Sequence, residues 1–335
     1  MVARPIPQFD TSAEVQLDTS AEVQHERVVA IDRIKACAIV AVLLTHAGPM
    51  RFGIPVVPVE FWLRRGWTIF HVPAFLIVAG TLYRQGTPMS AATFMRRTAR
   101  VVVPYLSAVA LWAAIGIVPL PPWPQVPGAL LLGATYGIYY FVPVLVGCIA
   151  LGWLASRLPA YALWVLLAGL LAYACVERFV PAVMMSADSV FWRVRDPLVQ
   201  FWFGYFLCGW LAVPQSLGTR LPRWVLVAVA LAALPFYVID NTWVFMRVVY
   251  SVAVVAWLWV TPIRFPGMRL LSETSLAIYL LHAPVQDALA ARIWTWPAAA
   301  RVPLIASVGC LVSLAFCFSA PRLVGRERAR FWFGT

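Results

Sequence analysis

Three of the four histidines stand inside long apolar segments of the sequence, at His46, His71 and His282. Ionisable side chains are costly in such surroundings, so those that persist are candidates for chemistry. A neutral imidazole changes its protonation state near neutral pH and can therefore act as a general base. Any one of them alone is equally compatible with a packed ring bonded to a neighbouring carbonyl. Three together, in a chain with so few polar segments, favour a chemical role.

Lys35 lies eleven residues before His46 in the first of these segments. On an α-helix this spacing is three turns plus about 20°, so both side chains project from one face, roughly 16 Å apart along the axis. The spacing predicts a cation at the mouth of a channel and a proton-handling group at its far end. The alternative is that Asp32, Arg33 and Lys35 are only a basic flank with local pairing, which marks the cytoplasmic end of a span.

An arginine pair, Arg97 and Arg100, precedes the third apolar segment. Residues three apart on a helix project from nearly the same face, and guanidinium forks suit phosphate groups. The pair therefore qualifies as a phosphate site. Taken without any other motif, it is better explained as a topology signal of the kind found at the cytoplasmic ends of spans.

The elements that must position these residues are predicted to be membrane-spanning helices. The chain is 62% apolar and 12% charged with a mean hydropathy of +0.81, whereas ordinary soluble domains are about 45–50% apolar and about 25% charged. This composition excludes a soluble enzyme, a disordered protein and a disulfide-stapled secreted module. We expect an all-α polytopic membrane protein with about ten transmembrane helices. The spans are predicted at about 31–49, 67–83, 101–118, 138–156, 160–179, 197–213, 223–239, 243–262, 275–294 and 302–320.

Three regions follow from this pattern. Residues 1–27 are a polar tail containing a tandem repeat, which we expect to be disordered and cytoplasmic. Residues 28–322 form the ten-helix membrane domain, and residues 323–335 form a basic cytoplasmic tail. The segment 126–136 is too short to cross a bilayer and is expected to be interfacial or re-entrant.

The basic residues predict the orientation of the chain. Of the 26, 17 fall on the side of the N-terminus and nine on the other, so both termini are expected in the cytoplasm of a multi-pass plasma membrane protein. The charges are scattered between apolar runs and do not form the patch that nucleic-acid binding needs. The six cysteines lie mostly in apolar runs without metal-ligand spacing, so we expect free thiols and no metal site.

Five motifs in order resemble those of the acyltransferase-3 family of integral membrane proteins, over about residues 28 to 320. They are IDRIKACAIVAVLLTH with Lys35 and His46, FHVPAFLIVAG with His71, Pro73, Phe75 and Gly80, RRTAR with Arg97 and Arg100, YYFVPVL, and LSETSLAIYLLHAPV with His282. Two positions depart from the family pattern. Ala79 stands where serine is usual, and Tyr140 stands where tryptophan is usual.

The resemblance implies an enzyme that transfers an acyl group, usually acetyl, from cytoplasmic acetyl-CoA to a hydroxyl of a glycan or lipid-linked glycan. It places Lys35, Arg97 and Arg100 at the CoA phosphates and His46 as the general base. His71 would help to bind the acceptor, and His282 would support the site or take part in the chemistry. No residue is identified as the oxyanion donor that such a reaction needs.

Acceptor contacts are expected from the outer loops, where Arg51, Glu60, Trp67 and Asp240 are candidates. The tryptophans there are also explained by the interfacial aromatic belt of membrane proteins. Some relatives carry an esterase-like domain. We expect none in this chain, so a separate extracytoplasmic transferase partner is a further expectation. The rival hypotheses are a transporter or flippase of an anionic, lipid-linked substrate and, with less support, an inactive structural partner.

Overall fold

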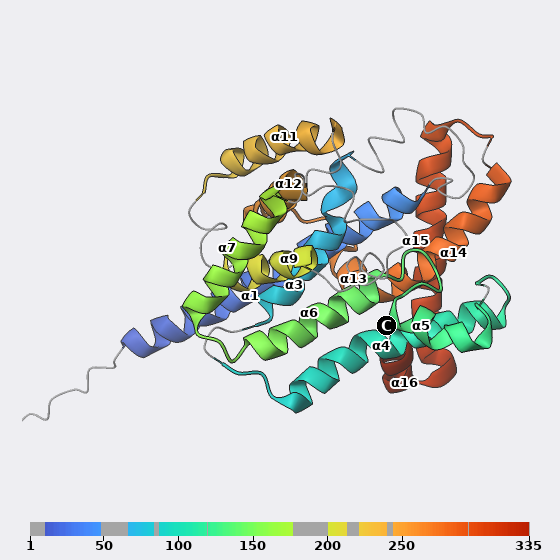
Figure 1. The fold of residues 1–335 in the computed structure, drawn as a ribbon, viewed down its shortest axis with the longest axis horizontal. Helices are drawn as coiled ribbons and strands as arrows, with labels where there is room; N and C mark the ends of the chain where they lie inside the picture. The colour runs from blue at the N-terminus through green and yellow to red at the C-terminus, as the bar shows by residue number, and fades with distance from the viewer. Residues whose placement is uncertain are drawn as a thin grey trace, which may run out of the picture.

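The computed structural model describes residues 11–47, 66–83, 87–118, 120–176, 200–212, 221–239, 244–293 and 295–334. Within those ranges the chain is helical and has no strand, which confirms the all-α class (Figure 1). The elements are α1 Thr11–His46, η2 Trp67–Phe70, α3 His71–Thr81, α4 Ala91–Ala114, η3 Trp123–Gln125, α5 Val126–Leu131, α6 Phe141–Ala155, α7 Ala160–Val176, α9 Gln200–Leu211, α11 Arg223–Ile239, α12 Val244–Val260, α13 Met268–Glu273, α14 Ser275–Ile293, α15 Ala298–Val324 and α16 Arg326–Phe333.

Helix α1 is the axis of the bundle. It crosses the molecule in Figure 1 and packs against α3, α12, α13, α14 and α15. Its residues Ile34, Ile39 and Val42 are fully buried. Helices surround α1 on several sides, so this part of α1 does not need a polar face toward solvent. Residues that face different neighbours on α1 are therefore placed in different environments.

At its N-terminal end, α1 extends beyond the first predicted span. Helix α1 starts at Thr11, inside the stretch that we expected to be a disordered tail. Each copy of the polar repeat contains Ala, Glu and Gln, which are good helix formers, so propensity supports continuation of the helix toward the N-terminus. The limits of the three regions remain predictions.

Within the described ranges, one helix is long and apolar enough to cross a membrane by itself, the 27-residue α15. The segments Trp67–Thr81, Phe141–Ala155, Ala160–Cys175, Arg223–Phe236 and Val244–Val260 are apolar but shorter. Large apolar side chains are exposed on the outer helices, for example Val165 on α7, Leu231 on α11 and Leu311 on α15. An exposed apolar surface of this kind marks an interaction surface, and lipid is the natural partner. The number of spans remains a prediction.

Helices α3 and α9 cross in close backbone contact, and two glycines permit it. A Cβ built on Gly80 would collide with the carbonyl oxygen of Phe206, and one built on Gly209 would collide with that of Ile77. Small residues at helix crossings let backbones approach in this way in membrane proteins. The glycine that closes the FHVPAFLIVAG motif is therefore explained by packing.

The segment after the proline-rich loop contains only the six-residue helix α5, in line with its being too short to span. It then turns at Gly133, whose φ is +63° and whose Cβ would meet the backbone of Tyr139. The turn directs Tyr139 into the core, where the ring is fully buried and its hydroxyl donates a 2.8 Å hydrogen bond to the carbonyl of Leu280 on α14. This segment supports the middle of α14.

Candidate active site

His46 and His282 lie together at the centre of the helical bundle. Their ring centroids are 5.5 Å apart with an interplanar angle of 54°, and the helices that carry them, α1 and α14, pack directly. His46 is half-buried and His282 is fully buried. The resemblance left His282 between a supporting role and a chemical one, and the structure places its ring next to His46.

The hydrogen bond of His282 determines which nitrogen is available. Nδ1 lies 2.9 Å from the carbonyl oxygen of Ile278 and must therefore carry the proton that it donates. In the neutral ring Nε2 is then the basic nitrogen. It is buried and has no hydrogen-bond partner among the described residues. Asp287, the nearest acid along α14, instead accepts a hydrogen bond from Tyr136, so His282 is not paired with it.

His71 begins α3 and is held in the same way. Its Nδ1 lies 2.6 Å from the carbonyl oxygen of Thr68 in η2, which leaves Nε2 as the basic nitrogen of the neutral ring. The hydroxyl of Tyr250 donates a 2.7 Å hydrogen bond to the carbonyl of Trp67 and so ties η2 to α12. His71 is half-buried, and α3 packs on α1.

A polar cavity of about 980 Å³ lies between α1, α3, α4, α6, α13, α14 and α16. Lys35 and Arg100, two of the predicted phosphate ligands, both line it. Arg269, Glu273 and Arg330 also line it, and none of these three was singled out from the sequence. In the sequence analysis, Arg269 and Arg330 were counted only as basic residues that mark the cytoplasmic side. A search for cations that converge on one end of the bundle would have identified both.

Aromatic rings connect the inner end of this polar cavity to the histidine pair. Phe75 and Phe141 have centroids 6.0 Å apart, and Phe141 meets Tyr279 edge-on at 5.3 Å. All three line the cavity. The ring of Tyr279 lies 6.1 Å from that of His282, and its hydroxyl donates a hydrogen bond to the carbonyl of Ile138. The ring of Tyr279 therefore lies between the cavity and His282, and the histidines themselves do not line the cavity.

The two arginines of the RRTAR motif have different environments. Arg100 lines the polar cavity, but Arg97 is not among its lining residues. The guanidinium of Arg97 lies 4.7 Å from the ring centroid of Tyr83, and its Nη2 donates a 3.2 Å hydrogen bond to the carbonyl of Leu82 at the C-terminus of α3. A cation is favourable at that end of a helix. Arg97 thus links α4 to α3, and Arg100 alone of the pair reaches the cavity.

The basic flank of α1 divides in a similar way. Arg33 is 5% exposed; its Nη1 donates to the carbonyl of Leu258 at 2.7 Å and its Nε to that of Ile263 at 2.9 Å, at the C-terminal end of α12. Asp32 accepts a 2.6 Å hydrogen bond from Ser272. These two residues fix the base of α1, whereas Lys35 lines the polar cavity. The hydrogen bonds of Asp32 and Arg33 thus tie α1 to segments far along the chain, whereas Lys35 faces the cavity.

The charges at the cavity are predominantly basic. Glu273 is the acid among its lining residues, and it accepts a 2.7 Å hydrogen bond from Nε of Arg269. That bond raises the pKa of Arg269. The two side chains are 82% and 57% exposed, so the ion pair is screened by water and an anionic ligand could displace it. Ala79, which replaces the usual serine, also lines the cavity.

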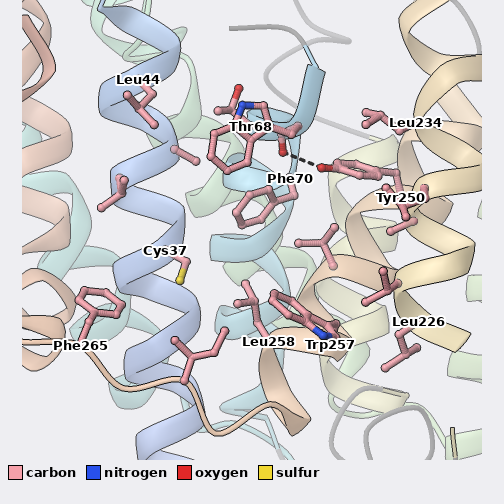
Figure 2. A pocket seen from close by; sticks show the side chains of 18 residues that line it. Cys37, Leu44, Thr68, Phe70, Leu226, Leu234, Tyr250, Trp257, Leu258 and Phe265 are labelled. Carbon is pink, nitrogen blue, oxygen red and sulfur yellow. Dashed lines mark hydrogen bonds between the residues drawn. The ribbon is translucent and has the colours of Figure 1, made fainter. Parts of the chain in front are cut away.

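A second cavity, of about 590 Å³, is lined by residues on the face of α1 opposite to Lys35. Figure 2 shows the side chains that line it. Cys37 and Leu44 line it from α1, Phe70 from η2 and Trp257 from α12, with further apolar residues from α11. Trp67 also lines this apolar cavity, with its side chain 48% exposed. The walls of this cavity suit hydrocarbon, and its described lining residues include no Lys or Arg to bind a phosphate.

The other predicted outer-loop contacts, Arg51, Glu60 and Asp240, lie outside the residues that the structure describes. Among those that it does describe, no group of three or more His, Cys, Asp or Glu side chains is arranged to hold a metal ion.

Comparison with known families gives one result for this chain. A model of the acyltransferase-3 type, described as an acyltransferase domain, matches residues 28–320. No curated protein and no solved structure matches the chain. The matched region contains both members of the histidine pair, His71 and most of the polar cavity.

Proposed function

The chain belongs to the acyltransferase-3 family of membrane acyltransferases, and on that premise we propose that it is an O-acetyltransferase. In this proposal the acetyl group comes from cytoplasmic acetyl-CoA and is transferred to a hydroxyl of an extracytoplasmic or lipid-linked glycan. Family membership supports acyl transfer in general; the acetyl donor and the glycan acceptor are the parts that we propose.

The observation that carries this proposal is the polar cavity with the histidine pair beyond its inner end. Lys35 and Arg100 supply positive charge to its wall, and Tyr279 at its inner end contacts His282. The helical distance from Lys35 to His46 is roughly 16 Å at 1.5 Å per residue. An extended pantetheine arm must cover a separation of this order when its phosphates are bound by the cations and its thioester is at the imidazole.

The chemistry assigned to the site is general-base catalysis. His46 removes the proton from the acceptor hydroxyl, and the oxygen attacks the carbonyl carbon of the thioester. The tetrahedral intermediate collapses when the carbon–sulfur bond breaks, and the CoA thiolate leaves with the proton returned from His46. His282, 5.5 Å away, holds His46 in place, and His71 orients the acceptor from the start of α3.

The proposed topology agrees with the position of the cations. With both termini in the cytoplasm of a multi-pass plasma membrane protein, Lys35 near the start of the first predicted span (31–49) and Arg100 just before the third (101–118) lie toward the cytoplasmic side. Acyl-CoA reaches the bundle from that side. The acceptor would approach from the other side, where the loops that carry Arg51, Glu60 and Asp240 are expected and where Trp67 of η2 remains a candidate contact. It receives the acetyl group directly or through a separate extracytoplasmic partner.

The test is transfer of labelled acetyl from acetyl-CoA to membrane glycan in vesicles that contain the protein. We expect His46→Ala to abolish labelling at unchanged protein level and His25→Ala, which alters the histidine outside the apolar segments, to leave it intact. Labelling that persists in His46→Ala would remove the proposed base. Movement of a lipid-linked substrate across the membrane without any acetyl transfer would support the transporter hypothesis instead.

A further inference from the structure

Helix α16 follows the region that matches the family model, and it is packed on the membrane domain. The sequence predicts residues 323–335 as a basic tail separate from the domain. In the structure, residues Arg326–Phe333 form a helix that packs against α4 and α15 (Figure 1). The tail can therefore contribute residues to the polar cavity that α4 also lines.

Four features fix the orientation of α16. Gly325 has a φ of +86°, which lets the chain turn sharply after α15. Ala329 is fully buried, and Phe333 meets Phe316 of α15 edge-on with ring centroids 5.0 Å apart. At its C-terminus, Gly334 adopts a left-handed conformation and lies so close to α4 and α14 that a Cβ would come within 3.5 Å of Pro104.

This orientation directs one arginine of α16 toward the polar cavity. Arg330 and Gly334 line the cavity, whereas Arg326 and Arg328 of the same helix do not. Arg330 is exposed and Arg269, across the cavity on α13, is 82% exposed. Lys35 is half-buried. The exposed arginines therefore lie at the mouth of the cavity, and Lys35 lies deeper.

The charge of the mouth fits an anion with more than one phosphate. Arg269, Arg330 and Arg100 come from three separate helices, and Glu273 is the acid that faces them. Guanidinium groups bind phosphate oxygens through paired, charge-assisted hydrogen bonds. Cations from separate elements around one opening can hold separate phosphates of the same ligand.

We propose that α16 is part of the donor site and that Arg330, together with Arg269, binds phosphates at the nucleotide end of acyl-CoA. This inference rests on the proposed function, because it assumes a CoA donor. It adds a specific role for a segment that lies beyond the family match and assigns the outermost contacts of the donor. Arg100 belongs to the same exposed phosphate site. Lys35, which lies deeper, then contacts the donor closer to the thioester.

The test compares donor binding by variants of the intact chain in lipid nanodiscs. The probes are CoA and pantetheine, which has the same thiol arm but no phosphate. We expect Arg330→Gln to weaken CoA binding about tenfold, as expected for loss of one charge-assisted contact to phosphate, and Arg330→Lys to weaken it less. Arg328→Gln, two residues away and outside the cavity lining, is the matched control and should bind CoA as the unaltered protein does.

Pantetheine separates a phosphate contact from a packing effect. Binding of pantetheine should be the same in the unaltered protein, Arg330→Gln and Arg328→Gln. Equal CoA affinity in Arg330→Gln and Arg328→Gln would overturn the inference and leave the proposed function standing. Equal weakening of CoA and pantetheine by Arg330→Gln would also overturn it. If the unaltered protein bound neither probe in a saturable way, the proposed function itself would fail.

Discussion

At the residue scale, neighbouring charges on one helix have separate tasks because they face different partners. Arg33 satisfies backbone carbonyls at the end of α12, whereas Lys35, two residues later, lines the polar cavity. Both are cations at the end of an apolar segment, and residue type alone does not distinguish them. The distinction arises because residues two apart on a helix point about 200° apart.

The first prediction uses this pair. Lys35→Ala should raise the KM for acetyl-CoA about tenfold with a smaller change in kcat, since one charged contact to phosphate is lost. Arg33→Ala should instead lower the free energy of unfolding by about 1–3 kcal/mol, because buried carbonyls lose their donors. Steady-state kinetics and denaturation in detergent measure the two effects. The assignment is wrong if Lys35→Ala destabilises the protein as much as Arg33→Ala.

The second prediction concerns the histidine pair. His282→Asn should lower kcat at unchanged KM for acetyl-CoA and alter the pH dependence of kcat, because the ring that contacts His46 is removed. His46→Ala should lower kcat further, by about 10²–10⁴-fold, as is usual for loss of a general base. Turnover with labelled acetyl-CoA across a pH series measures both. An unchanged pH profile in His282→Asn would reduce that residue to a packing role.

At the element scale, the site depends on how closely helices approach. The contact between α3 and α9 positions the helix that begins with His71, and it requires Gly80 and Gly209 at the crossing point. No side chain lies between the two backbones there. Protein interiors tolerate added volume poorly, because the surrounding structure relaxes only in part.

The third prediction follows from that crossing. Gly80→Ala and Gly209→Ala should each lower the free energy of unfolding by about 1–3 kcal/mol, because the added methyl overlaps a carbonyl oxygen. Gly169→Ala on α7 is the matched control, since a Cβ there meets nothing within 4 Å. It should be neutral or stabilise the helix by up to about 1 kcal/mol. Thermal unfolding in detergent measures all three, and equal effects would contradict the crossing.

At the scale of the whole molecule, α1 separates a polar cavity from an apolar one. Lys35 and, by its helical position, His46 face the polar side, whereas Cys37 and Leu44 line the apolar cavity on the other (Figure 2). Of these two cavities, only the polar one has charged side chains among its described lining residues, so we expect the charged substrate to bind from that side. The orientation of the bundle in the membrane therefore decides from which compartment the donor is taken.

The fourth prediction tests that orientation. Arg326→Cys, on the exposed face of α16, should react with a membrane-impermeant thiol reagent in inside-out vesicles and not in intact cells. Trp296 lies in the turn between α14 and α15 and is 49% exposed. Trp296→Cys should react in intact cells and not in inside-out vesicles. The unaltered protein serves as the background control, because its described cysteines are buried or half-buried free thiols. Labelling of both variants from the same side would reject the proposed topology.

The sequence by itself determined the helical class, the family and the set of histidines. Composition and apolar segments are local properties, and the fixed spacing of Lys35 and His46 constrains one helix without reference to any other. The pairing of His46 with His282, the separation of Arg97 from Arg100, and the arrival of Arg269 and Arg330 at the polar cavity were decided only by the tertiary structure. Each of these depends on which helices pack together and on the rotation of each helix about its axis. Side-chain packing between segments distant in the chain sets both, together with close backbone approach at residues such as Gly80 and Gly209.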